Sequence, residues 1–280
     1  MKKEAYLICS DLDDTLLTTE KTITEKSQNA IQSLVKNGHY FVLCSGRPYQ
    51  GLFHYAQQLS LPNIPVIVSN GAAIVWPNLA NGKIEKIVTF DIEKSLFCHL
   101  YQEVRPYLNA CLASRINRLY TFHPERLPFW IIHQNNLVTL LEGEVDQLVE
   151  GDILNATFQI SQKDISAFLQ IIKKDIYHSL LFFDWGEYDG IHTYEISSKE
   201  ATKGKALLYL SSYYQISSHH TIAFGDAPND LSMLQDASEG VCMQNASNTI
   251  KELCHYQTEK THNEDGVIDY LQAHHAHLWK

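Results

Sequence analysis

The sequence predicts an α/β protein whose parallel-sheet core is interrupted by an inserted second domain. Three observations favour this fold class. Both ends of the chain alternate short apolar runs with helical patterns, which is typical of a parallel sheet with crossover helices. The apolar runs are continuous, as they are in strands that are covered on both faces. Between the two ends, the sequence changes to longer amphipathic stretches with more aromatic residues, which indicates a separate domain.

The first part of the chain supplies predicted strands and one crossover helix. The strands are residues 6–10, 40–44 and 66–69. Over residues 24–36, apolar side chains recur at helical spacing, with Thr24 as the N-cap and Gly38 just beyond the C-terminus. Because a helix joins the first strand to the second, we expect the two strands to run parallel.

The same alternation returns near the C-terminus. Apolar spacing predicts a helix around residues 206–214, followed by strands at 221–224 and 240–243. The two ends of the chain therefore look like parts of one sheet. At roughly 150 residues per domain, a length of 280 residues leaves room for about two domains, with one large domain as the alternative. We expect residues 1–82 and 198–280 to form the core, and residues 83–197 to form the inserted domain.

Composition and charge narrow the classes of partner. Hydrophobic residues make up 45% of the chain and charged residues 19%, so the chain can bury a full core. The net charge of −10, from 22 basic and 32 acidic residues, repels polyanions, and we expect no nucleic-acid partner. No apolar run approaches the roughly 18 residues of a membrane helix, so we expect no membrane partner.

The expected location is the cytoplasm. The N-terminal segment reaches Asp11 before an apolar region of signal-peptide length forms. The six cysteines include no C-x-x-C pair, and several lie inside apolar runs. We therefore expect reduced, buried thiols, as in other cytoplasmic proteins.

Two acidic segments follow predicted strands directly. Asp11 and Asp13 come after the first strand, two residues apart, so both side chains can share one face. Asp226 and Asp230 follow the strand at 221–224. The carboxyl edge of a parallel sheet is where such folds bind ligands, although an acidic turn that caps the next element explains the first segment equally well. Four clustered carboxylates would repel one another without a cation, and their hard oxygen ligands favour Mg²⁺.

Other polar residues at strand and helix ends are weaker candidates. The turn Ser45-Gly46 before a helix offers hydrogen bonds to an anion. Lys203 opens the predicted C-terminal helix, but Lys199 and Lys205 compete with it, and a solvated surface lysine is the ordinary alternative. Asn70 follows the strand at 66–69, where a structural Asn-Gly turn explains it nearly as well.

In this order, the motifs resemble those of the haloacid dehalogenase superfamily of phosphohydrolases. The matching residues are Asp11-x-Asp13-x-Thr15, Ser45, Lys203 and Gly225-Asp226-x-x-Asn229-Asp230. The long insert, Ser-Gly-Arg-Pro at 45–48, Asn70-Gly71-Ala72 and Glu264-Asp265-Gly266-Val267 resemble the Cof-type subfamily with a C2 cap. The insert itself matches only by position and size. Ala227-Pro228 in the last motif and Asp14 in the first depart from the more familiar pattern, but neither removes a catalytic group.

The resemblance implies a Rossmann-like core with an inserted α+β cap, and a Mg²⁺-dependent phosphatase acting on small phosphorylated metabolites. The substrates would be phosphate monoesters such as a sugar phosphate, a nucleotide or a cofactor phosphate. By this analogy, Asp11 attacks phosphorus and forms an aspartyl-phosphate. Asp13 protonates the leaving alcohol and then deprotonates water, while Lys203 stabilises the negative charge. The cap would close over the site and select the leaving group.

The same resemblance implies the ligand roles. Phosphoryl oxygens would bind to Lys203, Ser45, Asn229 and the backbone amides of Leu12 and Gly46. Mg²⁺ would bind to Asp11, Asp226 and the backbone carbonyl of Asp13, with Asp230 and Asn70 in supporting positions. A dehalogenase has no need of Asp13, whereas a phosphomutase or a non-catalytic phosphosugar-binding regulator remains an alternative.

Overall fold

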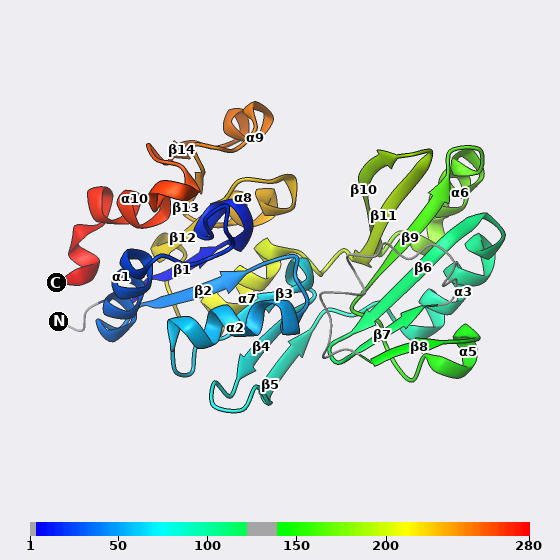
Figure 1. The fold of residues 1–280 in the computed structure, drawn as a ribbon, viewed down its shortest axis with the longest axis horizontal. Coiled ribbons are helices and arrows are strands. Elements are labelled where there is room, and N and C mark those ends of the chain that lie inside the picture. Colours follow the sequence, from blue (N-terminus) through cyan, green and yellow to red (C-terminus); the bar gives the residue numbers. More distant parts are fainter. Residues whose placement is uncertain (1–3, 122–138) are drawn as a thin grey trace. The chain divides into compact units, whose positions relative to one another are not determined.

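The structure is a computed structural model that describes residues 4–121 and 139–280. The chain divides into two compact units, which Figure 1 shows in the colours of the sequence. The first unit comprises Met1–Val88 and Thr202–Lys280, and the second comprises Thr89–Ala201. Both junctions lie a few residues beyond the expected ones at 82/83 and 197/198.

A largely parallel sheet forms the centre of the first unit. In the described residues it has eight strands in the order β14-β13-β12-β1-β2-β3-β4-β5. The strands from β14 to β3 run parallel, and β4 is antiparallel to β3. Their bounds are β1 Leu7–Ser10, β2 Tyr40–Cys44, β3 Val66–Val68, β4 Ala73–Pro77, β5 Ile84–Thr89, β12 Thr221–Gly225, β13 Glu239–Cys242 and β14 Tyr256–Gln257.

The register of this sheet brings distant segments to one edge. Ser10, the last residue of β1, pairs with Leu43 on β2 and with Phe224 on β12. The backbone N–H of Asp11 then donates to the carbonyl of Phe224 over 2.9 Å. The loops that follow β1, β2 and β12 therefore leave the sheet side by side.

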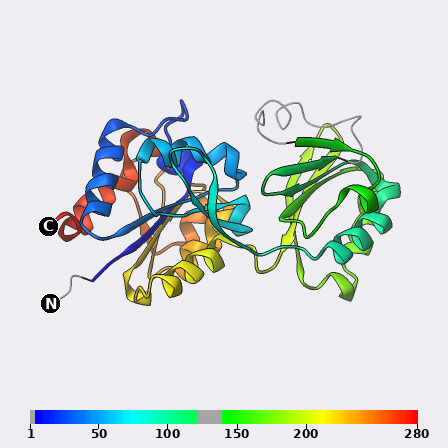
Figure 2. The same ribbon diagram turned by 90° about the horizontal axis from the view of Figure 1, so that it is seen from below.

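Helices cover both faces of this sheet. Figure 2 shows α1, α2 and α10 on one face and α7 and α8 on the other. The helices of this unit are α1 Glu25–Lys36, α2 Tyr49–Leu59, α7 Lys203–Tyr213, α8 Leu231–Asp236, α9 Asn248–Leu253 and α10 Gly266–His274. Coverage on both faces explains why the strands are continuously apolar.

The predicted crossover helix is confirmed, and so are the residues expected at its two ends. The Thr24 side chain accepts a hydrogen bond from the backbone N–H of Ser27, so Thr24 is the N-cap of α1. Gly38 has a φ of +93°, the left-handed conformation that glycine adopts beyond a helix end. Between them, Ile31 and Leu34 are fully buried.

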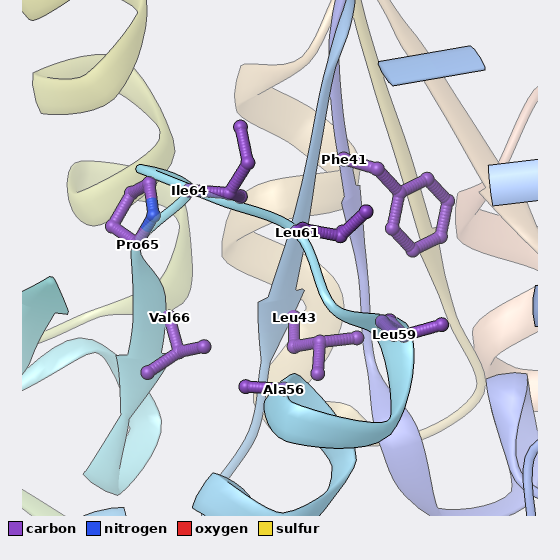
Figure 3. Close-up of a pocket in the computed structure, with 8 residues that line it drawn as sticks. All are labelled: Phe41, Leu43, Ala56, Leu59, Leu61, Ile64, Pro65 and Val66. Atoms are coloured by element: carbon purple, nitrogen blue, oxygen red, sulfur yellow. The ribbon is translucent and has the colours of Figure 1, made fainter. Parts of the chain in front are cut away.

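A small apolar cavity lies between α2 and strands β2 and β3, as Figure 3 shows. Its lining is Phe41, Leu43, Ala56, Leu59, Leu61, Ile64, Pro65 and Val66. The cavity measures about 10 Å³, roughly the space of one water molecule. It is a packing gap of the core and is too small to bind a metabolite.

The second unit has a sheet of its own. In the part of the chain that the structure describes, its six strands follow the order β10-β11-β9-β6-β7-β8. All pairs are antiparallel except β7 with β8. The elements are β6 Leu108–Arg115, β7 Arg118–Thr121, β8 Thr139–Glu142, β9 Asn155–Ser161, β10 Leu180–Tyr188, β11 Ile191–Ser198, α3 Lys94–Val104, α5 Val145–Leu148 and α6 Ile165–Ile172.

One face of the second sheet packs against helices. Phe97 and Leu100 of α3, Phe168 of α6 and Phe158 of β9 belong to a single buried cluster. Antiparallel strands with helices on one face make this unit α+β. The predicted fold class, a parallel-sheet α/β core with an inserted α+β domain, is confirmed.

The six cysteines are free thiols. Cys9, Cys44, Cys111 and Cys242 are buried, and the other two are partly buried. Across residues 4–121 and 139–280, no helix has the length and apolar character needed to cross a bilayer.

Candidate active site

The first acidic segment forms an irregular turn at the end of β1. Residues 12–16 form a single wide turn, in which the N–H of Leu17 donates to the carbonyl of Leu12 over 2.8 Å. Asp13 is extended at φ −72° and ψ 125°, and Asp14 adopts a φ of +58°. Aspartate tolerates this left-handed conformation better than most residues. Because of the kink at Asp13 and Asp14, the side chains of Asp11 and Asp13 point in different directions.

Lys203 bridges two buried carboxylates. Its Nζ donates to Oδ1 of Asp11 over 2.5 Å and to Oδ1 of Asp230 over 2.6 Å. Only 1% of Lys203, 6% of Asp11 and none of Asp230 is exposed. Burial by itself would lower the pKa of Lys203, but the two carboxylates outweigh it and raise the pKa. Lys203, rather than Lys199 or Lys205, is therefore the lysine of the site, and it stays charged.

Asp230 supports the loop that follows β12. Its Oδ2 accepts the backbone N–H groups of Asp226 and Ala227, both over 3.0 Å. A Cβ on Gly225 would lie 2.4 Å from the Cβ of Asp230, so the loop requires glycine there. Both carboxylate oxygens of Asp230 are thus engaged by donors of the protein, which fits a supporting position.

Asp11 and Asp226 remain as ligands for a cation. One oxygen from each of Asp11, Asp226 and Asp230 lies within 4.8 Å of the others. Oδ1 of Asp226 also accepts from Oγ1 of Thr15 over 2.7 Å. Burial raises the pKa of Asp226 to about 6 although Thr15 opposes the shift, and burial likewise raises the pKa of Asp11 against Lys203. A cation would offset this cost, and two carboxylates with water and phosphate oxygens suit Mg²⁺.

The carboxylate of Asp13 lies outside the group formed by Asp11, Asp226 and Asp230. Its two oxygens accept from Nη2 and Nε of Arg47, both over 2.7 Å, and Nζ of Lys21 lies 3.0 Å from Oδ1. Burial by itself would raise the pKa of Asp13, but the bonds from Arg47 and Lys21 outweigh it and lower the pKa. The side chains of Arg47 and Lys21 thus keep the Asp13 carboxylate ionised and paired.

Sequence reasoning missed Arg47 and Lys21 as members of the site. Arg47 directly follows the Ser45-Gly46 turn, and that position was the available signal. Its side chain also donates to the carbonyl of Gly51 and lies 5.4 Å from the ring of Tyr55. Lys21 lies in a short turn, in which its N–H donates to the carbonyl of Thr18. Nothing in its sequence context marked it.

Three of the residues expected to hold phosphate, Ser45, Gly46 and Asn229, lie next to Asn70. The N–H of Ser45 donates to the carbonyl of Ile67. The Oγ of Ser45 accepts from the N–H of Arg47 over 3.2 Å. Oδ1 of Asn70 accepts from Nδ2 of Asn229 over 2.9 Å. A Cβ on Gly46 would lie 2.9 Å from the same oxygen of Asn70, so the turn and the two asparagines are in contact range.

Gly71 joins this group to Lys203. It has a φ of +97°, and a Cβ there would lie 2.2 Å from the carbonyl oxygen of Thr202. The Thr202 side chain accepts from the N–H of Lys205 over 3.1 Å and caps α7. The Asn70-Gly71 turn therefore packs directly against the start of the helix that carries Lys203.

A buried aspartate and lysine thus lie at the edge of the parallel sheet of an α/β core, beside carboxylates that fit a cation. Residues 8–271 match the family described as haloacid dehalogenase-like hydrolase. The chain belongs to this family, which confirms the resemblance predicted from its motifs.

Similar proteins align with this chain over nearly their whole length. The 5-amino-6-(5-phospho-D-ribitylamino)uracil phosphatase YitU of Bacillus subtilis is 30% identical, over 98% of this chain and 99% of its own length. YwtE of the same organism, which carries the same activity name, is 27% identical over 94% of this chain and 96% of its length. TM0651 from Thermotoga maritima superposes with a TM-score of 0.78 at 23% identity, covering 96% of this chain and 97% of that one.

Proposed function

We propose that the protein is a Mg²⁺-dependent phosphatase that hydrolyses small phosphate monoesters through an aspartyl-phosphate intermediate. The observation that carries this proposal is the buried carboxylate of Asp11, held by Lys203 at the edge of the sheet. A fixed carboxylate beside a permanent positive charge can approach an anionic phosphate. Membership of the hydrolase family and relatives named as phosphatases support the same reaction.

In the first step, an oxygen of Asp11 attacks phosphorus, and the bond to the ester oxygen breaks. The leaving alkoxide takes a proton from Asp13. Ser45, Asn229, Lys203 and the amides of Leu12 and Gly46 hold the other phosphoryl oxygens. In the conformation described, Asp13 is paired with Arg47, so its role as an acid requires that pairing to loosen.

In the second step, water attacks phosphorus of the aspartyl-phosphate, and the bond to Asp11 breaks. Asp13 takes the proton of that water, and inorganic phosphate leaves. Arg47 and Lys21 favour the ionised form of Asp13, and this form suits the role of a base. Mg²⁺ held by Asp11, Asp226 and the backbone carbonyl of Asp13 would neutralise charge between the carboxylates and the phosphate.

For the substrate, we propose a phosphorylated polyol or sugar that is joined to a planar ring. Two similar proteins carry the name 5-amino-6-(5-phospho-D-ribitylamino)uracil phosphatase, and both align over more than nine-tenths of this chain. In this proposal, the second unit, Thr89–Ala201, acts as a C2-type cap that selects the leaving group.

The test is phosphate release from a panel of phosphate monoesters, with Mg²⁺ and with EDTA. We expect metal-dependent release by the wild type and none by Asp11→Asn, because an amide is a poor nucleophile. Release by Asp11→Asn at the wild-type rate would contradict the assignment of the nucleophile. Accumulation of a sugar bisphosphate would indicate a mutase, and ligand binding without release would indicate a regulator.

A further inference from the structure

The face of the second sheet opposite its helices carries an apolar row on β10. Buried side chains alternate along the strands, with Tyr194 and Ile196 of β11 directed to the helix side. On β10, Leu181, Phe183 and Trp185 lie on the other face, and 53% of Trp185 is exposed. The rings of Phe183 and Trp185 meet edge to face at 4.7 Å. Leu181 and Trp185 are exposed and Phe183 is partly buried between them, so the three side chains form a contiguous apolar patch, a feature that can mark a binding site.

Hydrogen bonds hold this indole in place. Nε1 of Trp185 donates to Oε2 of Glu195 over 3.1 Å. Oε1 of Glu195 accepts from Nδ2 of Asn155 over 3.3 Å, and the hydroxyl of Ser114 donates to Oδ1 of Asn155. Trp185, Glu195, Asn155 and Ser114 thus form one row across strands β10, β11, β9 and β6. We call this set the indole row.

The chemistry of the indole row selects one kind of occupant. The fixed face of Trp185 offers a stacking surface for a planar ring. Glu195 places a negative charge beside it, which repels a phosphate and attracts N–H groups. The occupant that fits is therefore an uncharged heteroaromatic ring with an N–H edge, such as the imide of a pyrimidinedione.

We propose that the indole row is a binding site of the second unit for the planar, imide-bearing ring of the substrate. The proposal rests on the proposed function, because it identifies the ring end of a phosphorylated molecule. It assigns specificity to Trp185 and Glu195, with Asn155 and Ser114 as positioning residues for that carboxylate.

Flavin mononucleotide and D-ribitol 5-phosphate test this proposal as a matched pair. Both carry the same phosphoribityl arm, and only the first carries an imide ring. For Trp185→Ala, we expect kcat/KM toward flavin mononucleotide to fall by roughly tenfold while the value for ribitol phosphate is unchanged. Glu195→Gln should act in the same direction. Tyr188→Ala, at a position on the same strand that is 88% exposed, is the control and should leave both substrates unaffected.

Direct binding separates this proposal from the proposed function. Riboflavin lacks phosphate, so its fluorescence quenching on titration with protein reports ring binding without turnover. We expect quenching by the wild type and by Tyr188→Ala, and loss of roughly tenfold in affinity for Trp185→Ala. If the wild type and all three variants bind riboflavin with equal affinity, the proposed role of the indole row is wrong, even if the enzyme releases phosphate. Riboflavin binding without release from any ester would overturn the proposed function and retain the row.

A second copy of the chain is the competing occupant of this face. Light scattering after size-exclusion chromatography distinguishes the two. If Trp185→Ala converts a dimer to a monomer and leaves riboflavin binding unchanged, the indole row is a subunit interface and the proposal is wrong.

Discussion

Arg47 holds both carboxylate oxygens of Asp13 with Nε and Nη2, each over 2.7 Å. A planar guanidinium fits a carboxylate with two parallel hydrogen bonds, which a lysine cannot reproduce. The carboxylate that we propose as the acid is thus oriented by the residue that directly follows the Ser45-Gly46 turn.

Arg47→Lys should impair substrates according to their leaving group. Alkyl phosphates need a proton on the departing oxygen, which Asp13 delivers when one of its bonds to Arg47 loosens while the other keeps the carboxylate in place. A lysine does not hold that direction, so we expect their kcat to fall by roughly 100-fold. Phosphoryl transfer from 4-nitrophenyl phosphate needs no such proton, and a burst of nitrophenolate before slow turnover is expected. Lys21→Met, which removes a single contact to the same carboxylate, is the control with a smaller effect. Equal losses in the phosphorylation step for both ester types would argue against a role of Arg47 in placing the acid.

Gly71→Ala should damage both stability and activity. At a φ of +97°, a Cβ would lie 2.2 Å from the carbonyl oxygen of Thr202, so the Asn70-Gly71 turn and the start of α7, which carries Lys203, must move apart. We expect the free energy of unfolding to fall by about 3 kcal/mol or more, together with most phosphate release. Urea unfolding and turnover measure the two effects.

Gly38→Ala is the matched control for this substitution. Gly38 has a φ of +93°, but a Cβ there would meet nothing within 4 Å. Only backbone strain of about 1–2 kcal/mol should remain, and phosphate release should persist. If Gly71→Ala and Gly38→Ala lose the same stability and activity, the close contact with Thr202 does not explain the need for glycine at position 71.

Asp265→Ala should loosen the start of α1 from the C-terminal segment. Oδ1 of Asp265 accepts from the hydroxyl of Ser27 over 2.8 Å and from the hydroxyl of Thr24. Hydrogen bonds to a charged group contribute about 1.5–3 kcal/mol, and we expect a loss of this order in urea unfolding. Asp265→Asn keeps one acceptor oxygen and should recover part of it. A change within about 0.5 kcal/mol for the alanine variant would refute this account.

Glu239 should make stability depend on pH in the acid range. Oε1 of Glu239 accepts from the Tyr270 hydroxyl over 2.7 Å and lies 2.9 Å from Nε2 of His275. Burial by itself would raise the pKa of Glu239, but these bonds outweigh it and lower the pKa below its ordinary 4.5. The folded state then favours the ionised form more than the unfolded state does. This contribution is present above the unfolded pKa and is lost as pH falls through the folded pKa.

Unfolding by urea, compared between the wild type and Glu239→Gln, measures that contribution. We expect the difference in free energy of unfolding to be steady near pH 6 and to shrink below about pH 4.5. A difference that grows on acidification would contradict a lowered pKa of Glu239 in the folded state.

The core of the fold and most of the site could be predicted because they depend on local patterns. Continuous apolar strands, a capped helix at α1 and acidic residues just beyond strand ends are visible in the order of residues alone. The carboxyl edge of a parallel sheet then brings Asp11 and Asp226 together for any sequence of this topology. The antiparallel β4 was not predicted, because nothing in its composition separates it from a parallel strand.

The partners of each charged side chain could be known only from the folded chain. Lys203 reaches Asp11 across 192 residues of sequence, and Arg47 reaches Asp13 across 34. The spacing of Asp11 and Asp13 suggested one shared cluster, yet the kink at Asp14 and the guanidinium of Arg47 draw the second carboxylate away. Periodicity determines which face of an element is buried, because it reflects local geometry. The pairing of charges depends on distances between segments that only tertiary packing sets.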